Sequence, residues 1–240
     1  YRDYLAEFLA TLVFLVIGLG VNGQYKVSYH AEDAFFAAHF TWGLGIMCGV
    51  YVGHRISGSH LNPAVTLALA LFREFPKRKI LGYWLMQTLG AFVAAAIVFA
   101  SHNSMLNHFD SGNHQASGEF GTGGIFYVTP KDGVSLGNHF FSEFIGTVML
   151  LVVVCAVIDR RNNGDAGALV PIIFGFTVIA LLMALGFSTG FALNPARDLG
   201  PRIFALIVYG GDAFSNSNYY FWVPIVAPIL GALVGCFLYD

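Results

Sequence analysis

The sequence predicts an all-α membrane protein with six transmembrane helices and two re-entrant half-helices, arranged as an inverted repeat. Three observations carry this prediction. The 240 residues are 56% hydrophobic and 11% charged, whereas a soluble domain carries about 25% charged residues. Six apolar stretches are long enough to cross a bilayer, and the tripeptide Asn-Pro-Ala occurs twice. A water-soluble fold of this size could not bury so much apolar surface, so we exclude that class.

The elements follow from the apolar stretches, since a spanning helix needs roughly 20 apolar residues. The expected spans cover residues 4–21, 35–52, 80–100, 139–158, 168–187 and 219–239. Two shorter stretches, 63–72 and 195–209, begin inside the Asn-Pro-Ala copies. They are too short to span, so we expect them to be re-entrant. Non-helical backbone at membrane depth is tolerated only where it is buried in protein or lines a wet cavity.

The chain contains an internal repeat. Residues 6–12, AEFLATL, parallel residues 142–148, SEFIGTV, and Asn194 follows Asn62 by 132 residues. We therefore expect one domain over 1–240, with a first repeat at 1–102, a connecting loop at 103–138 and a second repeat at 139–240. Three spans in each repeat place the two repeats in opposite orientations.

Lysine and arginine predict the orientation, because loops on the cytoplasmic side carry an excess of them. With both termini inside, the inner loops hold Arg2, Arg55, Arg73, Lys77, Arg78, Lys79, Arg160 and Arg161. The outer loops hold only Lys26 and Lys131. We therefore expect cytoplasmic termini and an extracellular 103–138 loop. The chain begins with Tyr1 rather than Met, so we expect trimmed termini.

Several functions are not favoured by the sequence. The three cysteines lie in apolar runs and form no CxxC pair, and the four histidines of the connecting region are irregularly spaced. Neither pattern predicts a metal site or a disulfide framework. No basic tract interleaved with aromatic residues predicts nucleic-acid binding. No nucleophile–base pair or nucleotide loop is present, so we expect neither an enzyme nor a cofactor.

The Asn-Pro-Ala copies, Asn62-Pro63-Ala64 and Asn194-Pro195-Ala196, have a chemistry of their own. Proline suits the first helical position, and asparagine suits the N-cap. Two half-helices aimed at each other would bring two positive dipole ends and two side-chain amides to mid-membrane. The positive field of the two helix N-termini would disfavour cations there, whereas the oxygen of a water molecule or hydroxyl group could accept hydrogen bonds from both amides.

Residues 57–66, SGSHLNPAVT, and 190–198, GFALNPARD, resemble the two signature loops of the aquaporin, or major intrinsic protein, family. The resemblance covers essentially the whole chain. It implies a passive channel without cofactor or metal in a lipid bilayer, and a homotetramer with one pore per subunit. The plasma membrane is the expected location. The loop carbonyls would line the pore; they belong to Gly58, Ser59, His60, Leu61, Gly190, Phe191, Ala192 and Leu193.

The resemblance also implies a selectivity filter. Trp42, Phe191 and Arg197 match the Trp, Phe and Arg of glycerol-conducting members, and gapless counting puts Leu182 where those members usually have Gly. A register slip through residues 183–186 is the alternative. Two aromatic faces opposite a guanidinium suit a polyol, which has apolar CH on one side and hydroxyls on the other.

Other positions also match the glycerol branch: Asp198, Arg202 and the pair Pro224-Ile225. Asp198 would brace Arg197 or its loop, or would form a simple surface ion pair. Glu7 and Glu143 share one context in both repeats, which favours a structural role in accepting N–H groups of the two loops over a proton relay.

The sequence therefore predicts a passive channel for glycerol, related small neutral polyols and water that excludes ions and protons. Two alternatives remain open. One is a water-selective channel narrowed at Leu182, and the other is a proton-coupled polyol transporter that uses Glu7 and Glu143.

Overall fold

The computed structural model describes residues 1–28, 34–163 and 166–240, and these contain helices but no strand. The α-helices are α1 (Arg2–Lys26), α2 (Ala34–Ser57), α3 (Pro63–Phe72), α4 (Ile80–Asp110), α5 (Leu136–Ile158), α6 (Arg160–Asn163), α7 (Val170–Leu185), α8 (Pro195–Tyr209), α9 (Asp212–Tyr219) and α10 (Val223–Tyr239). Short 3-10 turns are η2 (Lys77–Lys79), η3 (Gly123–Ile125), η4 (Gly167–Leu169) and η5 (Tyr220–Trp222).

Six helical segments of the described chain are long and apolar enough to cross a membrane. They contain α1, α2, α4, α5, α7 and α10. The predicted all-α, six-span class is confirmed. The third span is longer than expected, since α4 continues from Ala100 to Asp110. Residues 101–110 are mostly polar but contain neither Pro nor Gly, so the helix continues beyond its apolar part.

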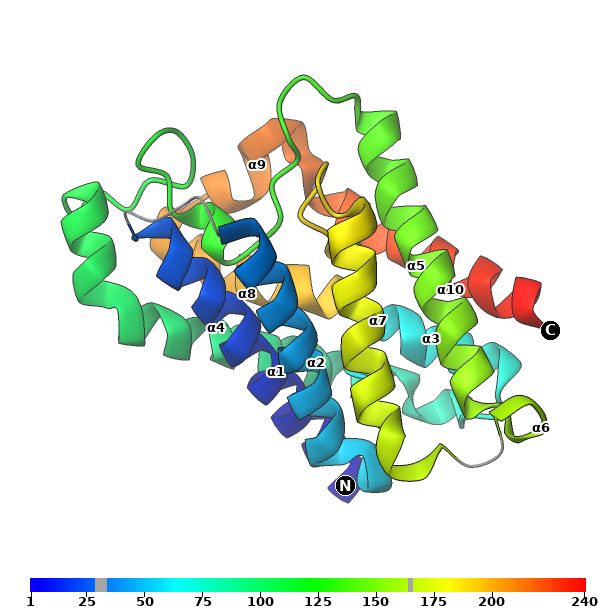
Figure 1. The fold of residues 1–240 in the computed structure, drawn as a ribbon. Helices are drawn as coiled ribbons and strands as arrows, with labels where there is room; N and C mark the ends of the chain where they lie inside the picture. The colour runs from blue at the N-terminus through cyan, green and yellow to red at the C-terminus, as the bar shows by residue number, and fades with distance from the viewer. Residues whose placement is uncertain (29–33, 164–165) are drawn as a thin grey trace.

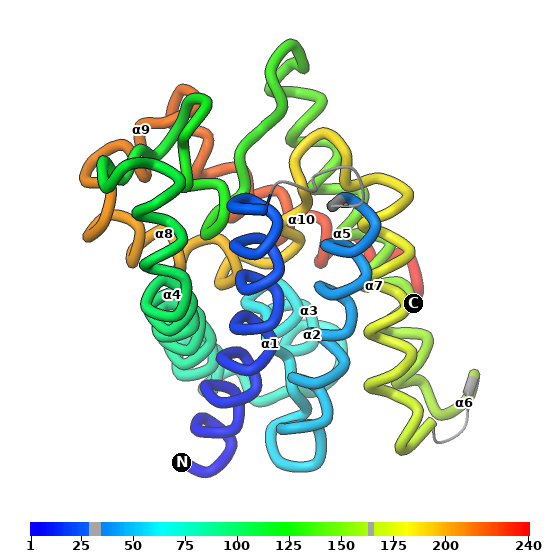
Figure 2. Tube along the Cα trace, turned by 60° about the vertical axis from the view of Figure 1, so that its left-hand side comes forward, coloured from blue at the N-terminus to red at the C-terminus, as the bar shows by residue number. Residues whose placement is uncertain are grey.

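The helices pack so that each half-helix contacts a span of the other repeat. Within the first repeat α1 packs on α2 and α4, and within the second α5 packs on α7 and α10. Across the repeats α2 packs on α7, α3 on α10 and α8 on α4. In Figures 1 and 2, α1 and α2 lie side by side, as do α5 and α7. The N-terminus and α6 lie at the lower edge of Figure 1, and α9 lies at the upper edge.

Glycines set the closest helix approaches at repeat-related positions. A Cβ added at Gly90 of α4 would meet the Phe8 carbonyl oxygen of α1 at 2.5 Å. A Cβ at Gly231 of α10 would collide in the same way with the Phe144 carbonyl oxygen of α5. Small residues at these crossings let the backbones touch, as is typical of membrane helix pairs.

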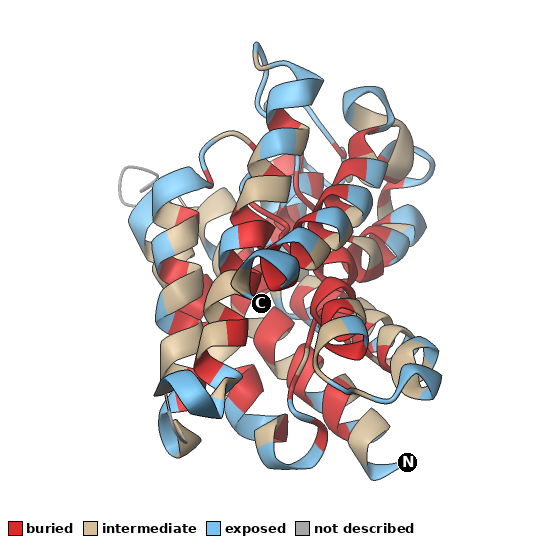
Figure 3. Ribbon diagram, turned by 90° about the vertical axis from the view of Figure 1, so that its right-hand side faces the viewer, coloured by how far each residue is buried: buried red, intermediate tan, exposed pale blue. Residues whose placement is uncertain are grey.

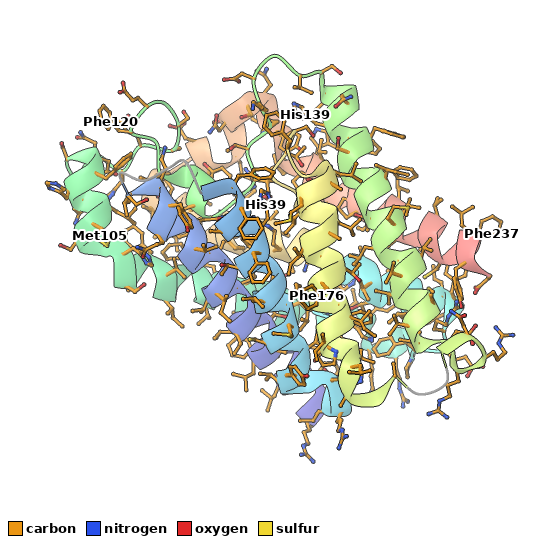
Figure 4. The ribbon with its side chains drawn as sticks, in the orientation of Figure 1. His39, Met105, Phe120, His139, Phe176 and Phe237 are labelled. Atoms are coloured by element: carbon orange, nitrogen blue, oxygen red, sulfur yellow. The ribbon has the colours of Figure 1, made fainter. Side chains whose placement is uncertain are left out.

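The outer surface is apolar and the interior holds charged groups. Figure 3 shows buried positions on the faces that the helices turn toward one another. Phe176 and Phe237, labelled in Figure 4, point outward and are 56% and 70% exposed. Glu7, Glu143 and Asp198 are fully buried. A chain with this distribution is an integral membrane protein, because lipid rather than water accommodates its exterior.

Candidate functional site

Two irregular loops, residues 58–61 and 190–193, precede the half-helices and share one backbone conformation. Non-glycine residues in both adopt positive φ, a region that costs an L-residue about 1–2 kcal/mol. The repeat-related pairs are Gly58 (91°) and Gly190 (76°), Ser59 (48°) and Phe191 (48°), and Leu61 (56°) and Leu193 (52°). Such conformations persist only where the surroundings hold them in place.

A buried carboxylate holds the first loop. Glu7 of α1 accepts hydrogen bonds from the backbone N–H of His60 at 2.9 Å and of Leu61 at 2.8 Å. The hydroxyl of Ser57 and the Nε2 amide of Gln87 donate to it as well, at 2.6 and 2.8 Å. Every oxygen of this carboxylate therefore has a donor, which is what a buried charge requires.

The second loop repeats the arrangement. Glu143 of α5 accepts from the backbone N–H groups of Ala192 and Leu193, both at 2.9 Å, and from the Thr189 hydroxyl at 2.7 Å. Gln87 was not found by sequence reasoning; its counterpart on α10, by the pairing of Gly90 with Gly231, is Pro228. Because the repeat does not copy Gln87, the pattern of the two halves could not point to it.

The half-helices are joined at their N-termini by the two asparagines. Asn62 caps α3, because its Oδ1 accepts from Ala64 N at 2.9 Å, and Asn194 caps α8 by accepting from Ala196 N at 3.0 Å. Each Nδ2 amide then donates to the opposite loop, Asn62 to the Leu193 carbonyl at 2.8 Å and Asn194 to the Leu61 carbonyl at 2.7 Å. A side-chain amide has two N–H donors, so one N–H of each asparagine remains for another acceptor.

Two cavities lie end to end, and the inner one passes the junction of the half-helices. The inner cavity has a volume of about 230 Å³ and is lined by Asn62, Asn194 and residues of both loops, opposite an apolar wall. The outer cavity has a volume of about 930 Å³ and has a mixed lining of polar residues, glycines and apolar residues such as Ile125, Val128 and Phe187. Trp42 and Arg197 line both cavities, so they stand at the boundary between them. We call this boundary the constriction.

The constriction is made of a stacked pair. The Arg197 guanidinium carbon lies 4.2 Å from the Trp42 ring centroid, within the range of a cation–π contact. Trp42 Nε1 donates to Asn22 Oδ1 at 3.0 Å, and Arg197 Nη1 donates to the Phe126 carbonyl at 3.4 Å. Neither Asn22 nor Phe126 was found from the sequence, since no motif marks them.

Phe191 and Leu182 join Trp42 and Arg197 in the lining of the inner cavity. Both side chains are buried. Residues 183–186, all within the described part of the chain, do not line that cavity. The residue found by gapless counting therefore lines the same cavity as the other three, and its proposed neighbours in a register slip do not.

Asp198 and Arg202 form a buried ion pair rather than a surface one. Arg202 Nε lies 2.8 Å from Asp198 Oδ2, and both side chains are at most 2% exposed. Asp198 Oδ1 accepts from Val128 N at 2.8 Å, and the Arg202 guanidinium carbon lies 4.1 Å from the Tyr127 ring centroid. The ion pair thus holds residues 127 and 128 in place. The neighbouring Phe126 carbonyl is thereby positioned to accept the hydrogen bond from Arg197.

Pro224 and His60 lie away from the constriction. Pro224 is buried near the start of α10 and lines neither cavity, and Ile225 does not line them either. His60 lines the inner cavity, where its Nδ1 lies 3.2 Å from the Thr66 hydroxyl. Among the described residues, no group of three His, Cys, Asp or Glu side chains is placed to hold a metal ion.

Six spans, two half-helices joined tip to tip and a cavity that passes the junction define a membrane pore protein. Residues 1–239 match the sequence profile of the major intrinsic protein family. The chain belongs to that family, as its signature loops predicted.

Named relatives span the whole chain. It is 44% identical over 239 residues to aquaglyceroporin-3 of Trypanosoma brucei brucei, covering 100% of this chain and 78% of the relative. It is 38% identical over 240 residues to human aquaporin-10, covering 100% and 80%. The X-ray structure of the aquaglyceroporin from Plasmodium falciparum superimposes with a TM-score of 0.91 at 34% identity, covering 100% of this chain and 95% of that one.

Proposed function

We propose that this chain is a passive channel for glycerol, related small neutral polyols and water. The observation that carries the proposal is the constriction, where an aromatic face and a guanidinium border the same opening. Relatives named aquaglyceroporins support this choice over a water-only channel.

The constriction suits a polyol chemically. Phe191 and the part of the Trp42 ring that Arg197 does not cover offer apolar surface to the carbon backbone, and Arg197 offers N–H donors to the hydroxyl oxygens. Loop carbonyls facing the inner cavity accept the hydroxyl protons. Because a polyol has one greasy and one polar side, it fits an opening whose wall is divided in the same way.

Ions and protons are excluded by two effects. The N-termini of α3 and α8 face each other, so their positive dipole ends oppose a cation at the junction. An ion would also have to replace its hydration shell against a wall that is apolar on one side. Asn62 and Asn194 still offer donors to a neutral oxygen there.

We assign Glu7 and Glu143 to holding the loops rather than to relaying protons. Both carboxylates are fully buried, line neither cavity and are occupied by loop donors. A coupled carrier needs a carboxylate that meets the solute path. The same geometry supports a channel rather than an enzyme.

Leu182 is the departure from the glycerol branch, and we propose that it narrows the passage beside Trp42. Leu182→Gly is then expected to raise glycerol flux several-fold in proteoliposomes. Leu185→Gly is the matched control, because Leu185 lies on the same helix, is 41% exposed and lines neither cavity.

One experiment tests the proposed function. Reconstituted protein is followed by stopped-flow light scattering under glycerol, sucrose and proton gradients. We expect glycerol and water to enter, sucrose to stay out and proton gradients to have no effect. Water flux without glycerol flux contradicts the polyol assignment, and glycerol accumulation driven by a proton gradient contradicts passive conduction.

Assembly and location are further parts of the proposal. We infer a homotetramer in the plasma membrane with both termini cytoplasmic, on the strength of family membership and the lysine and arginine bias. The face that carries the N-terminus is called the inner face below.

A further inference from the structure

Two of the three cysteines meet between adjacent spans. The Cys155 sulfur of α5 lies 2.9 Å from the Cys236 sulfur of α10, and both side chains are fully buried. The third, Cys48 of α2, is partly buried and free. The proposed channel makes no use of this thiol pair, so the inference does not depend on which solute is conducted.

The pair is close because the helices are. A Cβ at Gly235, one residue before Cys236, would meet the Val148 carbonyl oxygen at 2.5 Å and the Leu151 Cβ at 2.9 Å. Gly235 therefore lets the α10 backbone rest on α5. A disulfide sulfur separation is about 2.05 Å, so bonding needs a further approach of only about 0.9 Å.

The thiols lie one helical turn beneath a polar network at the inner face. Asp159 N donates to the Cys155 carbonyl, and Asp240 N donates to the Cys236 carbonyl. Arg73 donates to Asp240 at 2.8 Å and lowers the pKa of that carboxyl, and the Tyr239 hydroxyl donates to Asp159 at 3.2 Å. The Arg73 and Asp240 side chains are 21% and 38% exposed.

Partly exposed ion pairs are worth little, about 0–1 kcal/mol. In the packing of α10 on α5, the end of α10 near Asp240 is therefore expected to separate most readily. Its separation would expose Cys236.

We propose that Cys155 and Cys236 form a reversible disulfide, driven by a peroxide, that fixes α5 to α10. One thiol releases its proton, the thiolate attacks a peroxide oxygen, the O–O bond breaks, and a sulfenic acid and a hydroxide form. The hydroxide takes up the proton from the thiol and becomes the first water. The second thiol also releases its proton, its thiolate attacks the sulfenic sulfur, the S–S bond forms and the S–O bond breaks. The leaving hydroxide takes up that proton and becomes the second water. Two thiols and one peroxide thus give one disulfide and two waters. A dithiol reductant reverses the step.

The bond would lock one wall of the pore. α5 supplies Leu150, Val154 and Ile158 to the inner cavity, and α3, which packs on α10, supplies Val65 and Leu69. Fixing α5 to α10 therefore fixes the spacing of two pore-lining elements near the inner face.

The test uses the full chain in proteoliposomes treated with hydrogen peroxide. Thiols are counted after denaturation and alkylation, and disulfide-linked peptides are mapped by mass spectrometry. We expect the free thiols to fall from three to one, with 155 linked to 236, and dithiothreitol to restore all three. Three free thiols after excess peroxide, or oxidation of the pair to unlinked sulfinic acids, would overturn the proposal.

Variants separate the bond from general oxidation. Oxidised wild-type protein is expected to resist thermal aggregation at higher temperatures than reduced protein, and Cys236→Ala is expected to lose that difference. Cys48→Ala is the matched control and should keep it. Asp240→Asn weakens the Arg73 contact, so peroxide is expected to link the pair faster; an unchanged rate in Asp240→Asn overturns the access route.

Discussion

Trp42 is held in place by residues of α1 and of the 111–135 segment. Its indole N–H is held by Asn22, which in turn donates to the Ile125 carbonyl at 3.2 Å. Its ring fills the space left by the missing side chain of Gly18 on α1, where an added Cβ would lie 2.5 Å from two ring carbons. The aromatic half of the constriction thus depends on one absent methyl group.

Gly18→Ala should therefore displace Trp42 toward Arg197 and reduce glycerol flux markedly. Gly20→Ala is the control, because a Cβ there meets nothing within 4 Å and alanine favours a helix by about 0.5–1 kcal/mol. Stopped-flow glycerol permeability measures both. Equal permeability of the two variants would show that the Trp42 position is not set by Gly18.

Arg197 supplies the charge at the constriction. Arg197→Ala removes that charge and the cation–π contact with Trp42, so we expect proton or ion leak to appear while polyol flux persists. Arg197→Lys keeps the charge but loses the planar stack, so it should block ions better than alanine does. A pH-sensitive dye inside liposomes reads the leak. Tight liposomes with the alanine variant would contradict the filter role of Arg197.

At the scale of elements, the two loops persist in strained conformations because carboxylates hold them. Glu143→Gln keeps one accepting oxygen but turns an amide NH2 toward backbone donors. An unsatisfied buried group costs about 1–3 kcal/mol, so the variant should unfold at lower temperature and conduct less. Glu74→Gln, at an exposed position outside the site, is the control. Thermal unfolding in detergent that matches wild type would contradict the loop-holding role.

The half-helices were predictable because their signals are local. An asparagine cap and a proline at the first helical position are read within three residues, and the structure begins α3 at Pro63 and α8 at Pro195. The paired context of Glu7 and Glu143 likewise pointed to the loops, since a repeat shows which residues share a role. The half-helices and the role of the two glutamates could therefore be predicted without knowing the tertiary structure.

The supports of the constriction were not predictable in the same way. Asn22 acts through its side chain on α1, which no motif marks. Phe126 and Val128 act through backbone groups of a segment, 111–135, that has little regular periodicity. The Phe126 and Val128 contacts exist only once α8 brings Arg197 and Asp198 to that segment. Sequence reasoning singled out Asp198 and Arg202. Only the fold shows that the two side chains form a buried ion pair and that Asp198 accepts a hydrogen bond from the Val128 backbone.

The whole molecule has one face rich in arginine and lysine. If that face is cytoplasmic, Glu119→Cys should react with a membrane-impermeant maleimide on intact cells, whereas Arg161→Cys should react only after permeabilisation. Both positions are exposed, so access decides the result. The parent with its native cysteines gives the background. The reverse pattern would contradict cytoplasmic termini.

The apolar exterior must contact either lipid or other copies of the chain. For the proposed homotetramer, the detergent-solubilised protein is expected to have a protein mass of four 26.0 kDa chains, as measured by light scattering with the detergent contribution removed. A mass of one chain under mild conditions would contradict the proposed assembly.

The exchanged amides of Asn62 and Asn194 bear on how the protein is made. Asn62 binds a carbonyl 131 residues further along the chain. A ribosome adds about 5–20 residues per second, so the first asparagine waits on the order of ten seconds for its acceptor to be translated. The junction between the half-helices therefore forms only after the second repeat has been inserted into the membrane. A first repeat that is still being synthesised has no complete pore through which solutes could leak out of the cell.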